Sequence, residues 1–172
     1  MRSKNFPIYV AASKISGKGS FASRDIRIDE VVNIITGKEY NEKQVDDLIR
    51  KGKLRIDDDF QIDDDKFFVG PGVDYFTNHS CEPNAGVKNT NQIVAIRNIK
   101  KDEEITIDYS TISGIPKNDS NYRNDEWSMI CNCRSKNCRG KIGYVLSLPK
   151  KRLKKYIELG IMPDFITSVI SS

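Results

Sequence analysis

The sequence has no long hydrophobic run and few cysteines, and each absence excludes a class of protein. A membrane-spanning helix needs about 18 consecutive apolar residues, and no segment of the 172 residues comes close to that length. Four cysteines are too few for the disulfide scaffolds that stabilise small secreted domains. The sequence therefore predicts a protein that neither crosses a membrane nor depends on disulfides.

The residues that are present are typical of one folded domain. Apolar residues make up 38% of the chain and charged residues 30%, which lies within the range of globular proteins. The 28 basic and 24 acidic residues leave a net charge of +4, too small by itself to indicate nucleic-acid binding. The apolar stretch 6–12 is interrupted by Pro7 and Tyr9, so we interpret it as a first strand and not as a signal peptide. We accordingly expect an intracellular, reducing setting.

Short β-branched and aromatic runs predict strands throughout the first two thirds of the chain. One helix is predicted between them, with Asn41 as its N-cap and Gly52 as its stop. The acidic triplets 57–59 and 63–65 flank a short apolar centre, which favours a solvated turn or hairpin over a cation site. The predicted strands cover residues 8–11, 19–22, 31–35, 67–69, 93–99 and 104–109.

The last part of the chain carries helix signals and a run of positive charge. A polar, turn-rich linker is predicted over 111–125. Pro149 then occupies a first-turn position of a helix, and Gly160 is its stop. The basic run 150–155 fits the solvated face of this helix better than a nuclear address or a nucleic-acid patch. The predicted apolar face consists of Leu153, Tyr156 and Ile157.

The cysteines are spaced like metal ligands. Cys131, Cys133 and Cys138 form a C-x-C-x4-C run, and Cys81 lies fifty residues upstream. Structural Zn²⁺ closes its shell with four thiolates, which is the number that this chain supplies. The spacing favours zinc over free thiols or a single disulfide. Such a site would hold the segment after residue 130 against the segment near residue 80, and removing the metal would loosen it.

Three further motifs are candidates for ligand contacts. His79 is the only histidine and lies within the polar string 78–84, Asn-His-Ser-Cys-Glu-Pro-Asn. It could join the metal, but four thiolates already fill the shell, so an orienting or ligand-contacting role is the sharper interpretation. The glycines of 17–20, Gly-Lys-Gly-Ser, allow a tight turn and a close approach of a ligand to the backbone. This segment is neither a P-loop nor a full dinucleotide fingerprint. The alternation over 103–109 predicts a half-buried strand that ends in a tyrosine.

Together these motifs resemble those of the SET-domain protein lysine methyltransferases. The resemblance runs in the family's order through residues 17–21, 78–84 and 103–109 and closes with the cysteine cluster and its trailing Arg139-Gly140. It implies an α+β, mainly β fold of small curled sheets with a pseudoknot. The implied division is a SET domain over 1–112 with a helical and acidic insert at about 41–75, a linker and post-SET zinc segment over 113–146, and a C-terminal helical tail over 147–172.

The resemblance also implies S-adenosylmethionine as the methyl donor, a lysine side chain as the acceptor and one structural zinc ion. Tyr109 matches the catalytic tyrosine, which we expect to orient the amine and not to act as a strong base, because an unperturbed phenol is protonated at neutral pH. The implied zinc ligands are Cys81, Cys131, Cys133 and Cys138. The residues implied to contact the cofactor are Gly17, Lys18, Gly19, Asn78, His79, Tyr109 and Trp127.

Some positions depart from the family pattern. Arg134 stands where the family commonly has glycine, so either the turn is less tight or Arg134 adopts a strained conformation. Lys141 replaces an aromatic residue that some relatives place against the adenine, and Trp127 or Tyr122 would supply that face, although a packing role for Trp127 is an equal alternative. Di- or trimethylation is expected to be sterically allowed, because the positions matching the extra channel tyrosine of monomethylating relatives are Ile107 and Val87.

The expected partner is a lysine-bearing protein or peptide. The acidic stretch 57–65 would dock a basic substrate such as a histone tail as an extended strand. A non-histone target is an open alternative, and so is a non-catalytic SET-fold binding module that holds zinc. The second is disfavoured because a mere scaffold has no need of Asn78, His79 and Tyr109 together. The expected location is cytoplasmic or nuclear and chromatin-associated, including a host nucleus for an effector, and monomer and dimer both remain open.

Overall fold

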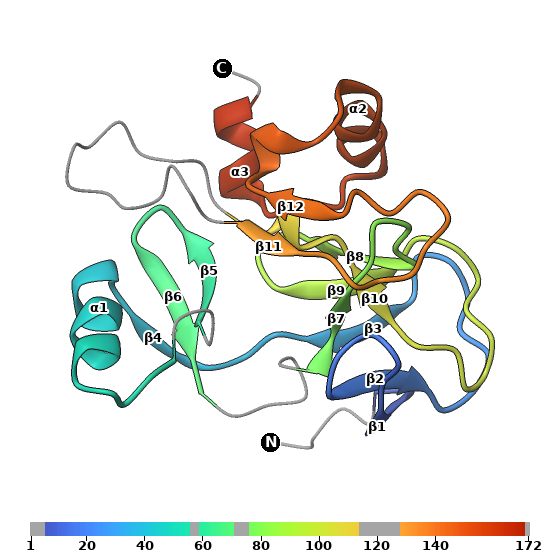
Figure 1. The fold of residues 1–172 in the computed structure, drawn as a ribbon, viewed down its shortest axis with the longest axis horizontal. Coiled ribbons are helices and arrows are strands. Elements are labelled where there is room, and N and C mark those ends of the chain that lie inside the picture. Colours follow the sequence, from blue (N-terminus) through green and yellow to red (C-terminus); the bar gives the residue numbers. More distant parts are fainter. Residues whose placement is uncertain (1–5, 56–58, 71–75, 114–127, 171–172) are drawn as a thin grey trace.

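The computed structural model describes residues 6–55, 59–70, 76–113 and 128–170. In these residues the strands form small sheets of two or three strands, accompanied by short helices (Figure 1). The expected α+β, mainly β fold is confirmed. No helix within the described ranges is long and apolar enough to cross a membrane.

The elements follow one another in this order: β1 (Ile8–Ala12), β2 (Lys18–Ala22), β3 (Val31–Ile34), β4 (Lys38–Tyr40), α1 (Glu42–Arg50), β5 (Asp59–Asp63), β6 (Lys66–Val69), β7 (Asn78–His79), β8 (Ala85–Lys88), β9 (Gln92–Ala95), β10 (Thr106–Ile107), the 3-10 turn η2 (Tyr109–Thr111), β11 (Ser128–Ile130), β12 (Lys141–Gly143), the 3-10 turn η4 (Val145–Ser147), α2 (Lys150–Leu159) and α3 (Asp164–Ile170).

The central packing joins strands that are distant in the sequence. β3 and β8 both pair with β9 in an antiparallel sheet, and β4, β6 and β5 form a second one. β7 and β10 pair in parallel, with Asn78 opposite Thr106 and His79 opposite Ile107. The segment after Asn78 thus lies beside the strand that leads to Tyr109, as the family resemblance implies. The buried core under these sheets consists of Ala22, Ile26, Val32, Ile35, Ala85, Val87, Ile93, Ala95, Ile99, Ile105 and Ile107.

The helix predicted between the strands is confirmed. Asn41 caps α1 by accepting a hydrogen bond from the backbone N–H of Gln44, whose side chain in turn accepts from the Asn41 N–H. This reciprocal capping satisfies two N–H groups that have no partner within the helix. Gly52 ends the helix with φ +66°. The acidic stretch after it includes the β5–β6 hairpin, as expected.

The predicted strand over 104–109 is shorter in the structure. β10 ends at Ile107 because the Asp108 carboxylate accepts a hydrogen bond from the Ser110 N–H and starts the turn η2. The strand predicted over 93–99 also ends early, at Ala95. Asp108 is thereby placed between a strand and the tyrosine that follows it.

The C-terminal helices pack against the sheet core. α2 begins after Pro149 and ends at Gly160, which has the left-handed φ of +60°. Beyond it, Ile161 lies against β8: a Cβ added to Gly86 would come within 2.5 Å of the Ile161 Cβ. The helices α2 and α3 and the turn η4 before them form a buried cluster from Val145, Leu148, Tyr156, Ile161, Met162 and Ile166. Ile157, assigned to the apolar face, is instead 40% exposed.

Candidate active site and metal centre

The parallel strands β7 and β10 bring the two main motifs of the sequence together. The Ser80 N–H donates to the Ile107 carbonyl at 2.9 Å, which extends the pairing beyond β7. Just after β10, the Tyr109 N–H donates to His79 Nδ1 at 3.1 Å. The centres of the two side-chain rings lie 5.5 Å apart. Tyr109 and His79 are therefore held in one rigid unit.

The Tyr109 hydroxyl is a hydrogen-bond donor in this structure. It donates to the Thr77 carbonyl oxygen at 2.9 Å. Removal of the Tyr109 side chain from water raises its pKa to about 12, and the nearby Glu104 carboxylate contributes to this rise. The phenol is therefore protonated at neutral pH, and its oxygen lone pairs are available to accept a hydrogen bond.

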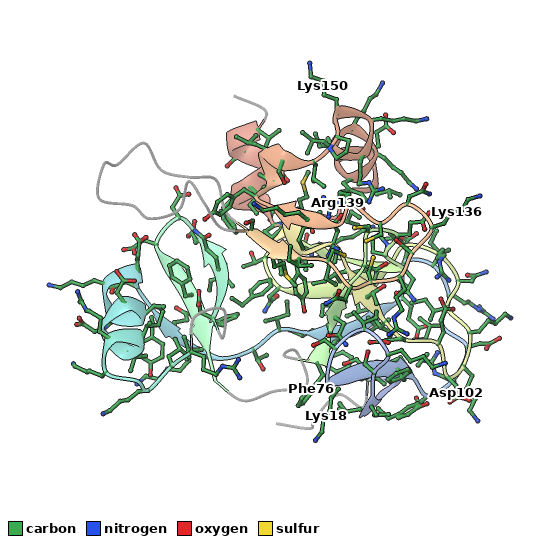
Figure 2. The ribbon with its side chains drawn as sticks, viewed as in Figure 1. Lys18, Phe76, Asp102, Lys136, Arg139 and Lys150 are labelled. Carbon is green, nitrogen blue, oxygen red and sulfur yellow. The ribbon has the colours of Figure 1, made fainter. Side chains whose placement is uncertain are left out.

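Asn78 connects the glycine-containing turn to the same unit. Its side-chain Nδ2 donates to the carbonyl oxygens of Ser16 at 3.2 Å and Lys18 at 3.0 Å. Gly17 has φ +45°, which a glycine adopts without strain. The Lys18 ammonium lies 5.9 Å from the centre of the Phe76 ring (Figure 2). The structure thus brings the 17–20 turn beside Asn78, two regions some sixty residues apart.

Glu104, which the sequence pattern places only within a strand motif, completes this arrangement. Its Oε1 accepts hydrogen bonds from Asn78 Nδ2 at 2.8 Å and from the Ser13 hydroxyl at 2.7 Å. A Cβ on Gly19 would lie 2.3 Å from the same oxygen. Gly19 is therefore required for the carboxylate to approach the turn. No local pattern around Glu104 predicts these partners.

His79 is buried and faces the cysteines. Since Nδ1 accepts the Tyr109 N–H, the proton of the neutral ring is on Nε2, which lies 3.3 Å from Cys81 Sγ. Burial lowers the pKa of His79 to about 4, although the nearby Asp108 carboxylate opposes this effect. The ring is therefore neutral at physiological pH, and its side chain links the tyrosine to the sulfur cluster.

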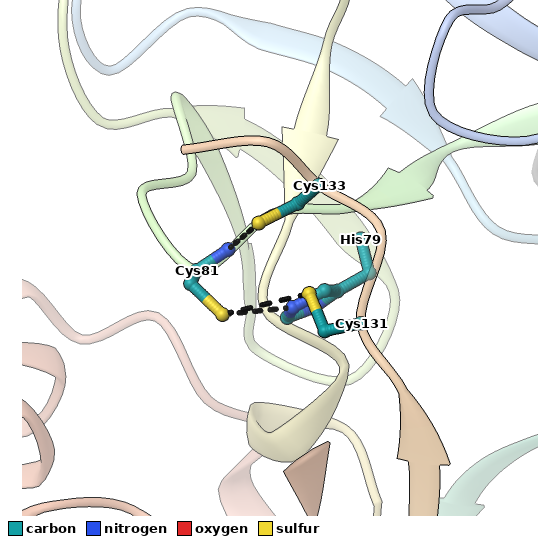
Figure 3. A group of neighbouring side chains, drawn as sticks. All are labelled: His79, Cys81, Cys131 and Cys133. Carbon is teal, nitrogen blue, oxygen red and sulfur yellow. Dashed lines mark hydrogen bonds between the residues drawn. The ribbon is translucent and has the colours of Figure 1, made fainter. Parts of the chain in front are cut away.

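The cysteines converge from two parts of the chain, as their spacing predicts. Cys81 follows β7, and Cys131 and Cys133 follow β11; their sulfur atoms and a ring nitrogen of His79 all lie within 4.8 Å of one another (Figure 3). The Cys81 and Cys131 sulfurs are 3.7 Å apart. All of these residues are buried. Three thiols at such distances are typical Zn²⁺ ligands, and the imidazole, whose Nε2 carries the proton, faces them as a hydrogen-bond donor.

Cys138, expected as the fourth thiolate, lies outside this close group. Its side chain is exposed. Its sulfur lies 3.8 Å from the Cys131 carbonyl oxygen and accepts the Gly140 N–H at 3.4 Å. Cys138 is thus adjacent to the cluster, while His79 occupies the fourth place in the compact group.

The protein stabilises thiolates unequally in the cluster. Burial disfavours the thiolate of Cys133, but hydrogen bonds from the Cys81 N–H and from Ser135 outweigh this effect and lower its pKa to about 6. Burial raises the pKa of Cys131. The Cys81 sulfur accepts from the backbone N–H and the Nε of Arg139, each at 3.3 Å. Such donors around sulfur are typical of the groups that surround metal-bound thiolates.

Arg134 and Lys141, which depart from the family pattern, both lie within the described residues. Arg134 has φ +58°, so the strained alternative for this residue is confirmed. Lys141 begins β12, opposite Ile130. Trp127 and Tyr122, the candidates for the adenine face, lie outside the described residues.

The comparisons with known proteins agree on one family. A sequence model of the SET domain matches residues 17–110. The chain is 29% identical over 157 residues to an Emericella nidulans protein named histone-lysine N-methyltransferase, H3 lysine-4 specific, which covers 81% of this chain and 12% of that protein. It is 28% identical over 147 residues to human histone-lysine N-methyltransferase 2D, which covers 77% of this chain and 2% of that protein. The chain thus spans only a small part of the length of these relatives.

Solved structures of Polycomb Repressive Complex 2 contain a similar fold. The TM-score is 0.58, at 19% identity, for apo ctPRC2 with mutations in Ezh2, and 64% of this chain and 16% of that chain are covered. For a humanized mutant of the Chaetomium thermophilum complex the TM-score is 0.54, at 22% identity and with the same coverage. At these identities the likeness concerns the fold alone.

Proposed function

Because this chain belongs to the SET domain family, we propose that it is an S-adenosylmethionine-dependent protein-lysine N-methyltransferase. The observation that carries the proposal is the unit formed by Asn78 and His79 on β7 and by Tyr109 just after β10, the strand that pairs with β7. Asn78 ties this unit to the 17–20 turn. A protein that served only as a binding scaffold would have no need for a protonated tyrosine held at both its backbone and its hydroxyl.

The chemical difficulty is to present a neutral amine. A free lysine has a pKa of about 10.4, so deprotonating it at pH 7.4 takes roughly 4 kcal/mol. S-adenosylmethionine, when bound, supplies an electrophilic methyl group and a positive charge that lowers the amine pKa. The Tyr109 hydroxyl donates to Thr77 and therefore offers its lone pairs to an N–H of the incoming amine. Tyr109 would orient the nitrogen lone pair, and positioning is the main catalytic device.

The cofactor would lie against the turn and Asn78. Gly17, Lys18 and Gly19 would contact it through backbone groups, because no other atom lies within 4 Å of where a Gly17 side chain would begin. The Asn78 amide nitrogen serves the turn, so its amide oxygen is the group left to accept a hydrogen bond from the cofactor's ammonium. His79 is buried toward Cys81, so its contact with the cofactor would come from the main chain. Trp127 remains the candidate for the adenine face.

A structural zinc ion would hold the post-SET segment on this unit. Cys81, Cys131 and Cys133 supply three ligands, and Cys138 is proposed as the fourth, with His79 as a hydrogen-bond donor to Cys81. The exposed position of Cys138 at the edge of the cluster fits a ligand that completes the shell from outside. The zinc has no role in the methyl transfer itself.

The proposed substrate is a lysine of a basic protein, with a histone tail as the leading candidate. The insert over 41–75 contains ten acidic and six basic residues, so it would attract a positively charged peptide. The curated relatives named above are histone-lysine methyltransferases, one of them named as specific for lysine 4 of H3. Such a substrate places the protein in the nucleus or on chromatin, or in the cytoplasm for a non-histone target. Di- or trimethyl lysine is the proposed product, since residues 87 and 107 are not tyrosine.

The direct test is transfer of labelled methyl from S-adenosylmethionine into core histones and into a whole-cell lysate. We expect labelling that Tyr109→Phe reduces at least a hundredfold, because the phenol oxygen that orients the amine is lost. Tyr9→Phe, which removes a surface hydroxyl bonded to Asp102, is the matched control and should label like the wild type. A zinc-loaded, cofactor-binding protein that labels nothing in either mixture would favour the non-catalytic binding module.

A further inference from the structure

Asp108 is a buried carboxylate whose partners come from distant parts of the chain. Its side chain has no solvent exposure, and a charge in such a position needs compensating partners. Its Oδ1 accepts from the Arg139 guanidinium at 2.5 Å and from the Ser110 N–H at 3.1 Å. Its Oδ2 accepts from the Tyr156 hydroxyl at 3.1 Å, and the Arg152 guanidinium lies 4.0 Å away. One oxygen therefore faces the post-SET segment, and the other faces α2.

The same residue starts the turn that positions Tyr109. Asp108 directly precedes Tyr109 and caps the turn η2. The Asp108 carbonyl accepts from the Thr111 N–H at 2.9 Å and from the Thr111 hydroxyl at 2.7 Å. The Tyr109 N–H is held by His79. A displacement of the Asp108 side chain would tilt this turn and move the phenol with it.

α2 also contacts the other strand of the parallel pair. The Arg152 guanidinium donates to the Cys81 carbonyl oxygen as well as facing Asp108. Cys81 follows β7, and Asp108 follows β10. A single arginine of the tail therefore bridges the ends of the two strands that carry His79 and Tyr109.

The tail is fixed firmly enough to act as such a support. Tyr156 is 3% exposed and lies in the buried cluster of the tail. Burial and the Asp108 carboxylate raise the pKa of Tyr156, so its hydroxyl stays a donor. The contact of Ile161 with Gly86 fixes the far end of α2 to β8. Lys150, in contrast, points away from the molecule (Figure 2).

We propose that Arg152 and Tyr156 of the C-terminal helix α2 are positioning residues for Tyr109, acting through the carboxylate of Asp108. The expected change in kcat rests on the proposed methyl transfer. The expected change in the position of Tyr109 rests on the geometry alone. The tail is, on this view, a part of the catalytic unit and not an appendage to it.

Tyr156→Phe is the sharpest variant, because it keeps the ring in the buried cluster and removes only the hydroxyl bound to Asp108. We expect kcat to fall about tenfold, the range of a hydrogen bond to a charged group, with the KM for S-adenosylmethionine and the zinc content unchanged. Tyr9→Phe is the matched control, since it also removes a tyrosine-to-aspartate hydrogen bond, at 2.9 Å but on the surface. It should have the wild-type kcat.

A double-variant cycle separates positioning from general destabilisation. If Tyr156 acts through Tyr109, adding Tyr156→Phe to Tyr109→Phe causes no further loss of rate. The ¹⁹F resonance of fluorotyrosine at position 109, assigned by its loss in Tyr109→Phe, should shift in Tyr156→Phe and not in Tyr9→Phe. Arg152→Lys should retain more of both the rate and the native resonance than Arg152→Met.

The outcomes that overturn the inference are distinct from those that overturn the methyltransferase proposal. An unchanged kcat together with an unchanged Tyr109 resonance in Tyr156→Phe contradicts positioning. A loss of rate that follows a loss of zinc or of cofactor affinity also contradicts it. If the wild-type protein transfers no methyl group, the proposed function fails and the resonance alone decides: a shift supports the positioning role, and an unshifted signal overturns it.

Discussion

The proposed insert over 41–75 and the proposed tail over 147–172 are both charged, yet they relate to the site in opposite ways. The insert, formed by α1, β5 and β6, lies to one side, while the tail helices α2 and α3 lie over the sheet core (Figure 1). Ion pairs of the insert, such as Arg50 with Asp47, are at the surface. The tail instead directs Arg152 and Tyr156 to the buried Asp108. The burial of their polar groups, and not their charge content, distinguishes the proposed docking surface from the proposed structural support.

The two arrangements differ in energy. An exposed ion pair contributes about 0–1 kcal/mol to stability. Removing one partner of a buried charge is more damaging, on the order of 3–5 kcal/mol, because the remaining charge is left without compensation. Variants in the tail and at its contacts should therefore affect folding and catalysis together, whereas variants in the insert should affect substrate binding.

The largest effect is expected at Cys81, where the cysteine cluster and the tail meet. Cys81→Ser removes the buried sulfur of a proposed zinc ligand, whose backbone carbonyl also accepts a hydrogen bond from Arg152. We expect the metal content to fall from about one zinc per chain to near zero, and the unfolding free energy to fall by on the order of 4 kcal/mol. Elemental analysis and denaturant unfolding measure the two quantities. A variant that keeps its zinc would contradict the proposed site.

Cys138→Ser sharpens the same test at the edge of the cluster. With Cys138 as the fourth ligand, this variant binds zinc more weakly than the wild type, while His79→Ala retains the metal. The reverse result, full zinc in Cys138→Ser and loss in His79→Ala, would assign the fourth position to the histidine that lies in the compact group.

Gly86→Ala tests whether the tail is part of the folded core. The new methyl group would come within 2.5 Å of the Ile161 Cβ, and overpacking of this kind destabilises by about 1–3 kcal/mol. We expect a lower thermal midpoint and a lower transfer rate. Ile161→Ala in the same chain makes room for the methyl group and should recover part of both. A midpoint equal to that of the wild type would mean that the tail is not firmly packed on β8.

A smaller effect is expected from the cap of the insert. Asn41→Ala removes the hydrogen bond to the Gln44 N–H and should lower stability by about 1 kcal/mol. Lys43→Ala, an exposed change on the same helix, is the control. Because α1 makes none of the described contacts with Asp108 or Tyr109, kcat should stay at the wild-type value. A fall in kcat as large as that of Tyr156→Phe would contradict the view that the tail supports the site and the insert does not.

The smallest effect on stability is expected from the acidic hairpin. Asp63→Asn with Asp64→Asn should change the unfolding free energy by less than about 0.5 kcal/mol. The KM for a lysine-rich peptide should rise a few-fold at low salt and converge with that of the wild type at high salt, because such attraction is screened. Glu158→Gln on α2 removes an acidic group outside the insert and serves as the control. Equal KM values at low salt would argue against substrate docking at the insert.

Local signals in the sequence were sufficient for α1, α2 and the close spacing of Cys131 and Cys133. Asn41 and Gly52 delimit α1 through interactions within a few residues. The short spacing of Cys131 and Cys133 indicated a metal site, and the structure brings Cys81 to them. These features depend on chemistry that is readable within a few residues of each position.

The features that the sequence did not predict depend on contacts between residues that are distant in the sequence. Tyr156 fits an apolar helix face by its spacing, and nothing near it in the sequence indicates that its hydroxyl reaches a carboxylate 48 residues earlier. The strand over 104–109 ends early because Asp108 caps a turn. Likewise, no local sequence pattern predicts that Glu104 accepts hydrogen bonds from both Asn78 and Ser13. Family resemblance located the motif positions, but the partners that hold them come from the fold.

The most direct test of the central claim is the initial rate of methyl transfer from labelled S-adenosylmethionine to histone H3, compared between the wild type, Tyr109→Phe and Tyr9→Phe. The account predicts lysine methylation by the wild type and by Tyr9→Phe and its near-complete loss in Tyr109→Phe. Equal rates in all three proteins would show that the tyrosine held between His79 and Thr77 is not the centre of the reaction.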